Sequence, residues 1–192
     1  EIGIPRTDDF NKGSNEGAGY FEVNQAKGIR WSTAKGFLHP IEKRENLTVL
    51  TGALTDRLLV EEGRVSGISF LLRGQKAKAT ATKEVVLSAG AVNSPKILEL
   101  SGIGNPEILA EFGVPVQHPL KGVGENLQDH LQIRTVYKIR NGRTLNEQAN
   151  SLFGKARMGL QYLVSQSGPL SMAPSQLGIF AKSDPGLETP DL

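Results

Sequence analysis

The stretch from Glu84 to Ser101 reads Glu-Val-Val-Leu-Ser-Ala-Gly-Ala-Val-Asn-Ser-Pro-Lys-Ile-Leu-Glu-Leu-Ser, and it decides the fold of this chain. Its apolar run, Val85 to Leu87, predicts a buried strand, and the helical spacing of apolar residues from Ile97 to Leu100 predicts a helix. Small residues, Ser88 to Gly90, separate the two. The stretch therefore predicts a strand, a tight turn and a helix, in that order.

The ends of the predicted helix carry their own signals. Asn93 or Ser94 can cap the first free backbone N–H groups, and Pro95 suits the first helical position. Gly102 can adopt the left-handed conformation that ends a helix. These residues predict a helix that begins near Ser94 and ends by Gly102.

The turn from Ser88 to Gly90 has two interpretations on local features alone. Small residues allow a helix to pack closely against a sheet, which is the commoner meaning of such a turn. They also let a ligand approach the backbone, where the positive end of a helix dipole attracts an anion. Local physics leaves both interpretations open.

Beyond this turn, local patterns predict several further elements. A short strand is expected at Tyr20–Gln25. A short helix is expected at Thr33–Leu38, with Ser32 as its cap. The helix Leu152–Leu163 is expected to use its apolar face for packing. The other predicted segments are strands at 47–50, 54–60, 65–72, 76–82, 131–139 and 177–182, and a helix at 106–112.

Three stretches carry a resemblance to a known family. The first contains Gly90-Ala91, Ser94-Pro95, Ile97-Leu98 and Ser101 to Gly104; the second is Gly28 to Ala34 with Asn46 to Val49; the third is Gly122 to His130. The second stretch precedes the first along the chain and the third follows it, and in this chain order they resemble the glucose-methanol-choline (GMC) flavoprotein oxidoreductases. Within that family, the motifs of the choline dehydrogenase branch are the most similar. The resemblance implies an α/β fold, α+β in this fragment. Residues 1–130 would be the middle portion of an FAD-binding domain of the glutathione reductase type, although the first few residues could belong to the substrate side. Residues 131–192 would be the start of a substrate-binding α+β domain.

The resemblance also implies FAD as the cofactor and marks candidate contacts to it. Thr55 stands where the backbone of one residue, often Val, hydrogen-bonds the adenine of FAD. The turn at Ala89-Gly90 and the loop that ends at His130 run close to the cofactor in the family. The candidate cofactor residues are Thr55, Ser88, Ala89, Gly90, Asn126, Asp129 and His130.

Each of these candidates also has a plainer interpretation. Thr55 is an ordinary β-branched strand residue, and Asn126, Asp129 and His130 can support a turn or hydrogen-bond one another in an exposed loop. Candidates for lining a substrate cavity, or for a surface loop, are Phe21, Asn24 and Gln25. No catalytic residue is expected in this chain, because the family's base is a His near the C-terminus, beyond Leu192.

The composition excludes several classes of function. The chain has 192 residues, with 22 Lys plus Arg against 20 Asp plus Glu and no cysteine. Scattered basic residues argue against a nucleic-acid partner, and the residues show no thiolate metal site, no zinc-type His spacing and no transmembrane segment. A Gly-x-Gly-x-x-Gly fingerprint is also missing. We expect an internal piece of a longer polypeptide that needs the remainder for activity, in the cytoplasm or associated with a membrane.

The resemblance implies an FAD-dependent alcohol oxidoreductase of the choline or alcohol dehydrogenase or oxidase type. In such enzymes a base deprotonates the alcohol while hydride passes from its carbon to flavin N5. The fragment alone is expected to be inactive. The alternative, from another class, is a non-catalytic binding or structural module that completes a partner chain.

Overall fold

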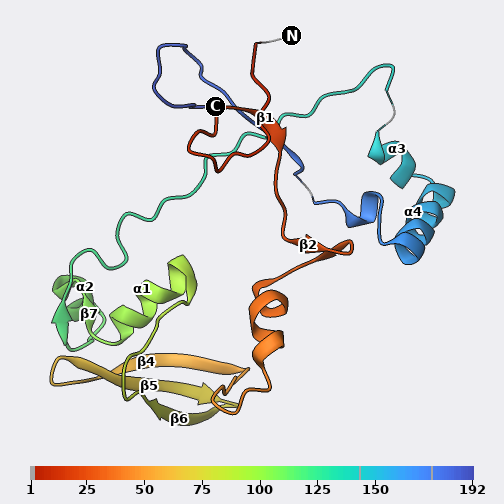
Figure 1. Cartoon of the computed structure of the whole chain (residues 1–192). Coiled ribbons are helices and arrows are strands. Elements are labelled where there is room, and N and C mark those ends of the chain that lie inside the picture. The colour runs from red at the N-terminus through yellow and green to blue at the C-terminus, as the bar shows by residue number, and fades with distance from the viewer. Residues whose placement is uncertain (1–2, 143, 174) are drawn as a thin grey trace. The chain divides into compact units, whose positions relative to one another are not determined.

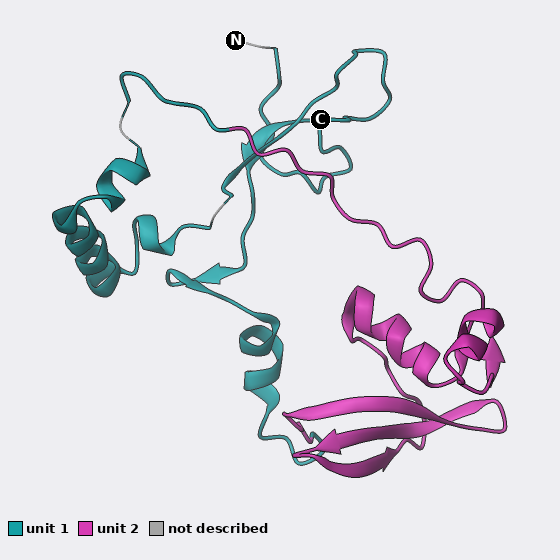
Figure 2. Ribbon diagram, turned by 180° about the vertical axis from the view of Figure 1, so that it is seen from behind, with its two compact units in different colours: residues 1–47, 136–192 teal, residues 48–135 magenta. Residues whose placement is uncertain are grey.

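The structure, a computed structural model, describes residues 3–142, 144–173 and 175–192. These residues form two compact units, one of residues 48–135 and one of residues 1–47 together with 136–192 (Figure 2). The division differs from the predicted boundary near residue 130. That boundary separates a cofactor domain from a substrate domain, and it stays a prediction.

A three-stranded antiparallel sheet forms the base of the 48–135 unit (Figure 1). Its strands are β4 (Ala53–Glu61), β5 (Arg64–Leu72) and β6 (Gln75–Thr80), in that order. The two connecting turns contain Gly63 and Gly74, which have φ of +77° and +82°. Glycine adopts such angles without steric cost, so the hairpins form where the sequence predicts them. The strand predicted at 47–50 does not form.

Helix α1 (Gly90–Leu100) begins four residues earlier than the predicted start near Ser94. Gly90 has a φ of +87°, a backbone angle that lets the chain turn directly into the helix. Pro95 therefore lies inside the helix rather than at its first position. The predicted end is confirmed, because Gly102 has a φ of +79° directly after the helix.

The predicted buried strand Val85–Leu87 is wrong for this structure. The segment has no strand assignment, and the Val86 side chain is 77% exposed. A buried strand needs hydrogen-bonded neighbours, and no described residue pairs with this segment. The apolar composition of residues 85–87 is visible in the local sequence, whereas the formation of a strand also depends on a partner strand elsewhere in the chain.

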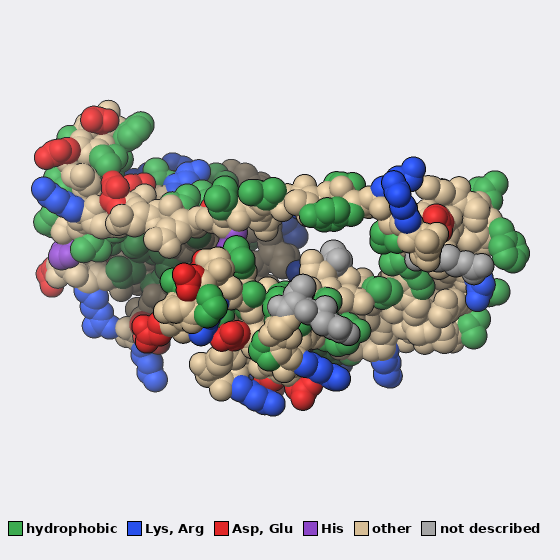
Figure 3. Space-filling model, turned by 90° about the horizontal axis from the view of Figure 1, so that it is seen from above, with side chains coloured by type: hydrophobic (Ala, Val, Ile, Leu, Met, Phe, Trp, Pro, Cys, Tyr) green, Lys and Arg blue, Asp and Glu red, His purple; other side chains and the backbone are tan. Residues whose placement is uncertain are grey.

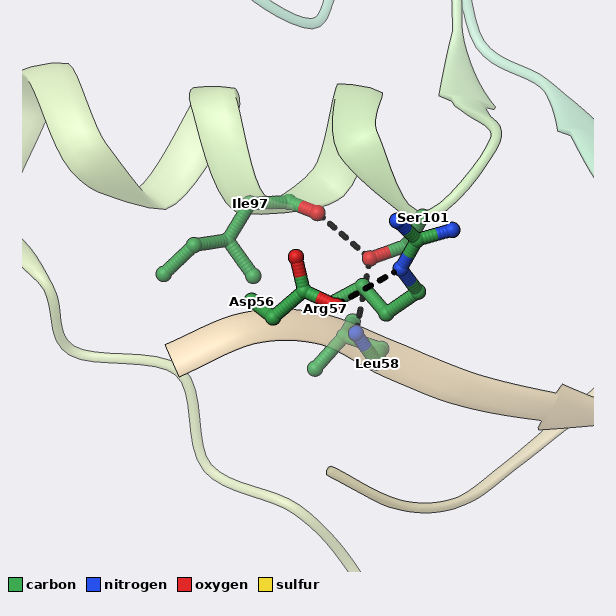
Figure 4. A network of polar contacts seen from close by, with 5 residues as sticks. All are labelled: Asp56, Arg57, Leu58, Ile97 and Ser101. Carbon is green, nitrogen blue, oxygen red and sulfur yellow. Dashed lines mark hydrogen bonds and ion pairs between the residues drawn. The ribbon is translucent and has the colours of Figure 1, made fainter. Parts of the chain in front are cut away.

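Helix α1 covers the outer edge of β4 through a small polar network (Figure 4). The Leu58 N–H donates to Ser101 Oγ at 2.8 Å, and the Ser101 hydroxyl donates to the Ile97 carbonyl. After α1, β7 (Ile103–Gly104) pairs in parallel with β8 (His118–Pro119) around α2 (Pro106–Glu111). The buried apolar residues of this unit are Leu58, Phe70, Ile97, Leu109 and Val123.

The other unit is built around a two-stranded antiparallel sheet, β1 (Gly17–Tyr20) with β9 (Leu177–Phe180). A short hairpin of β2 (Gln25–Ala26) and β3 (Ile29–Arg30) follows β1. The remaining elements are the short helices η1 (Ala34–Leu38), η2 (His39–Ile41), α3 (Leu145–Ala149) and η3 (Pro169–Ser171), and the longer helix α4 (Leu152–Ser165).

Several predictions fall in this part of the chain. Ser32 Oγ accepts from the Lys35 N–H at 3.4 Å, consistent with the predicted cap of the helix near 34–38. The predicted strand Tyr20–Gln25 is replaced by the ends of β1 and β2. The predicted strand at 131–139 does not form, and Leu131 is 95% exposed. Helix α4 forms as predicted, but its side chains Leu152, Leu160 and Leu163 are exposed rather than packed.

Candidate functional site

A pocket of about 350 Å³ lies between strand β4 and helix α1 in the 48–135 unit. We refer to it as the β4–α1 pocket. Two residues marked from the sequence, Thr55 and Ala89, lie on different elements and both line it. The full lining is Leu54, Thr55, Asp56, Leu71, Ala89, Asn93, Lys96, Ile97 and Leu100.

A β-bulge shapes the sheet wall of this pocket. Thr55 pairs with Phe70 and Arg57 with Ser69, so Asp56 is the extra residue on β4. A bulge bends its strand and redirects side chains, and bulges are common beside functional sites. Asp56 Oδ2 accepts from Arg57 Nε at 3.1 Å, as Figure 4 shows. The bulge therefore lies next to Thr55, at the point where β4 lines the pocket.

The lining of the pocket combines apolar and polar side chains. Apolar side chains of Leu54, Leu71 and Ile97 supply contact area, and a few polar groups are available for orientation. The volume is at the lower end of small-molecule pockets, which span about 300–1,000 Å³. It accommodates one part of a dinucleotide, such as an adenine, rather than the whole molecule. The residues present therefore fit the adenine end of FAD.

The start of α1 offers unpaired backbone donors beside this pocket. Ala89 occupies the N-cap position and provides no side-chain cap. The first N–H groups of a helix have no partner within the helix, so those of Gly90, Ala91 and Val92 can bind an anion. A Cβ built on Gly90 meets no atom within 4 Å, so the space beside it is open. Ser88 and Gly90 adjoin Ala89 but do not line the pocket itself.

The other candidate cofactor residues are not brought into this pocket. Asn126, Asp129 and His130 are exposed, and Asp129 Oδ1 accepts from the His130 backbone N–H at 2.8 Å. The local hydrogen bond agrees with the plainer interpretation of this loop. Residues 122–125 and 127 instead line a separate hollow of about 500 Å³ against α1.

The substrate-side candidates belong to the other unit. Asn24 and Gln25 line a pocket of about 560 Å³ between the β2–β3 hairpin and residues 170–173. Gln25 Nε2 donates to the Ser171 carbonyl at 2.6 Å, which fixes one wall. Phe21 does not line this pocket. It packs in an aromatic cluster, with its ring centroid 5.4 Å from that of Phe10 and 6.5 Å from that of Phe180.

Sequence reasoning missed three polar residues of the β4–α1 pocket: Asp56, Asn93 and Lys96. Asn93 and Lys96 follow Ala89 at helical spacing and share its face of α1, so the period of the helix was the signal that could have found them. Asp56 lines the pocket because of the bulge, which has no sequence signal. Within the described residues, no group of three or more His, Cys, Asp or Glu could hold a metal ion.

Comparisons with known proteins identify the family of this chain. Residues 1–132 match the family model described as GMC oxidoreductase. The chain belongs to this family. It is 40% identical over 192 residues to mitochondrial choline dehydrogenase of Homo sapiens and 39% identical over 195 residues to alcohol dehydrogenase [acceptor] of Pseudomonas putida. These alignments cover 100% of this chain and 32% and 35% of the two relatives.

A solved structure has a similar fold. The FAD-dependent oxidoreductase from Chaetomium thermophilum is 25% identical with a TM-score of 0.80, over 94% of this chain and 32% of that chain. The predicted family and fold class are confirmed, and the predicted FAD cofactor agrees with the family and this structural relative. The chain spans about a third of the length of its curated relatives. Among the described residues, no helix has the length and apolarity to cross a membrane.

Proposed function

We propose that this chain is a segment of an FAD-dependent alcohol oxidoreductase and that its β4–α1 pocket holds the adenine end of the cofactor. The observation that carries the proposal is the meeting of Thr55 and Ala89 in one pocket. Both residues correspond to cofactor-side positions in the family resemblance. When bound, the flavin accepts hydride from the alcohol carbon at N5.

The chain's own residues bind and orient. Leu71 and Ile97 exclude water from the adenine ring, while the backbone of Thr55 can hydrogen-bond its edge. The free N–H groups at the start of α1 favour an anion, an effect of about 0.3–1 kcal/mol at an exposed helix end. We assign a phosphate of FAD to this helix end.

The other candidate residues are assigned to positioning the cofactor and to lining the substrate side. The loop with Asn126, Asp129 and His130 positions the cofactor from another side, and Asn24 and Gln25 line the substrate side. The substrate is a small alcohol, as the names of the choline and alcohol dehydrogenase relatives suggest. No base is assigned among the described residues. A cytoplasmic or membrane-associated location and the absence of a nucleic-acid partner stay predictions.

One observation favours the second candidate, a non-catalytic module that completes a partner chain. Apolar side chains at 131–139 and on α4 are exposed, and they are available for a partner polypeptide. An absorbance spectrum separates the two candidates. Flavin bands in the purified full-length protein, with FAD released on denaturation, support the oxidoreductase, and a colourless protein supports the module.

A pocket-filling substitution tests the assignment of the site. Ala89→Leu should lower the FAD content of the folded full-length protein, because the larger side chain occupies the β4–α1 pocket. Ala110→Leu on the exposed side of α2 is the matched control and should retain the cofactor. Equal FAD content in the two variants would remove the adenine assignment.

A further inference from the structure

The hydroxyl of Ser94 makes a hydrogen bond that spans the first turn of α1. Its Oγ accepts from the Ala89 backbone N–H at 3.0 Å, and both residues are half-buried. Ala89 lies on the wall of the β4–α1 pocket, whereas Ser94 does not line that pocket. The bond therefore connects a residue outside the pocket to the backbone that shapes it.

This bond determines which backbone donors the turn presents. The Ala89 N–H is engaged by Ser94, so the N–H groups of the next three residues are the ones left for a ligand. Gly90 follows immediately at a φ of +87°. Because glycine has wide conformational freedom, the direction of these donors depends on restraints from neighbouring residues, and the Ser94 hydroxyl supplies one.

We propose that Ser94 is a positioning residue for FAD, which fixes the Ala89–Gly90 turn so that the pocket wall and the free N–H groups face the cofactor together. The proposal rests on the proposed function. Ser94 acts through the backbone of Ala89 and touches no reacting atom. Its effect is on cofactor affinity, whereas the packing of α1 on the sheet depends on Ile97 and on the Ser101 bond to Leu58.

Three variants of the full-length protein test this role. Ser94→Ala removes the acceptor, and Ser94→Thr retains a hydroxyl that can replace it. Ser151→Ala is the matched control, because Ser151 Oγ accepts from the Gly154 N–H at 2.9 Å at the start of α4, outside the β4–α1 pocket. The measurements are the FAD dissociation constant by flavin fluorescence, hydrogen exchange of the Ala89 amide and the thermal midpoint.

Ser94→Ala should weaken FAD binding by roughly fivefold to tenfold, as expected for one lost hydrogen bond, and should speed exchange of the Ala89 amide. Ser94→Thr should restore both values, and Ser151→Ala should change neither. Wild-type affinity in Ser94→Ala, or equal loss in the Ala and Thr variants, would overturn the positioning role alone. A wild-type protein without FAD would overturn this role and the proposed function together.

Discussion

At the scale of single residues, Ser101 illustrates how one polar side chain protects a sheet edge. It is 6% exposed, accepts from the Leu58 N–H and donates to the Ile97 carbonyl. Strand edges carry unpaired N–H groups, and burying one without a partner is costly. The Ser101 hydroxyl therefore satisfies a backbone N–H at the edge of β4, directly after the end of α1.

Ser101→Ala should lower the free energy of unfolding of this region by about 1–3 kcal/mol, because the Leu58 N–H loses its buried acceptor. Hydrogen exchange of residues 53–61 in the full-length protein measures the effect. Ser165→Ala is the control, since Ser165 Oγ also donates to the carbonyl four residues earlier but lies exposed on α4. Unchanged exchange of Leu58 in the Ser101 variant would contradict the edge-closing role.

Substitutions at two glycines, Gly90 and Gly63, distinguish the effect of backbone strain from the effect of contact with the cofactor. Gly90 and Gly63 have φ of +87° and +77°, and a Cβ on either meets no atom within 4 Å. Valine should therefore strain both backbones by a similar amount, about 1–2 kcal/mol. If FAD approaches the Ala89–Gly90 turn, Gly90→Val should lose much more FAD per folded monomer than Gly63→Val. Equal occupancy would return this turn to the interpretation of close helix packing.

The sequence marks only part of the lining of the β4–α1 pocket. Thr55 and Ala89 were found through the family resemblance, and the structure brings them to one pocket. Asp56 was missed because it lines the pocket through a β-bulge, which arises from the pairing of two strands. Asn126 and His130 lie in an irregular loop, whose side-chain directions local sequence patterns do not determine.

At the scale of elements, local interactions made the difference between correct and incorrect predictions. The β4–β5–β6 hairpins carry their turn residues between the strands, so their pairing is encoded nearby in the sequence. The segments at 85–87 and 131–139 have strand-like composition but pair with no described residue. Strand composition identifies a segment that fits a sheet, whereas a strand exists only with a neighbour.

Two hydrogen bonds between Ser183 and Asp191 close the loop that runs from Ala181 to Leu192. The side-chain and backbone hydrogen bonds from Ser183 lower the pKa of Asp191 below the ordinary aspartate value of about 3.9. The two donors lie 2.6 and 2.7 Å from the carboxylate oxygens. Because the folded pKa is lowered, the closure stabilises the loop above the ordinary pKa, and the stabilisation is lost as pH falls through the lowered value.

Carboxyl NMR titration of Asp191 checks this prediction. Ser183→Ala should raise its pKa part of the way toward the ordinary value, since the side-chain bond is the larger cause and the backbone bond remains. The hydrogen-exchange protection factors of residues 181–192, taken against the intrinsic exchange rate at each pH, should fall on acidification in the native protein. An Asp191 pKa that does not change in the variant would show that the hydroxyl plays no part in the closure.

At the scale of the whole molecule, the described residues include many exposed large apolar side chains and few buried ones. Among the described residues of the 1–47 and 136–192 unit, Met158 is the buried apolar side chain, at 9% exposure. Apolar side chains reach the surface in many places in Figure 3. Large exposed apolar patches mark interaction surfaces or aggregation-prone regions. Burial of apolar surface is the main favourable term in folding, so this unit has little to stabilise it alone.

We therefore expect residues 1–192, expressed alone, to bind a hydrophobic dye such as ANS and to oxidise no alcohol with any electron acceptor. Two physical reasons converge: the unit with Met158 lacks a sufficient core, and the sequence contains no Gly-x-Gly-x-x-Gly turn to bind the FAD pyrophosphate. Flavin content, dye fluorescence and turnover of the isolated chain, each compared with the full-length protein, are the measurements. Flavin-dependent turnover by the isolated chain would refute this expectation, because the pocket between β4 and α1 would then suffice without the pyrophosphate-binding turn.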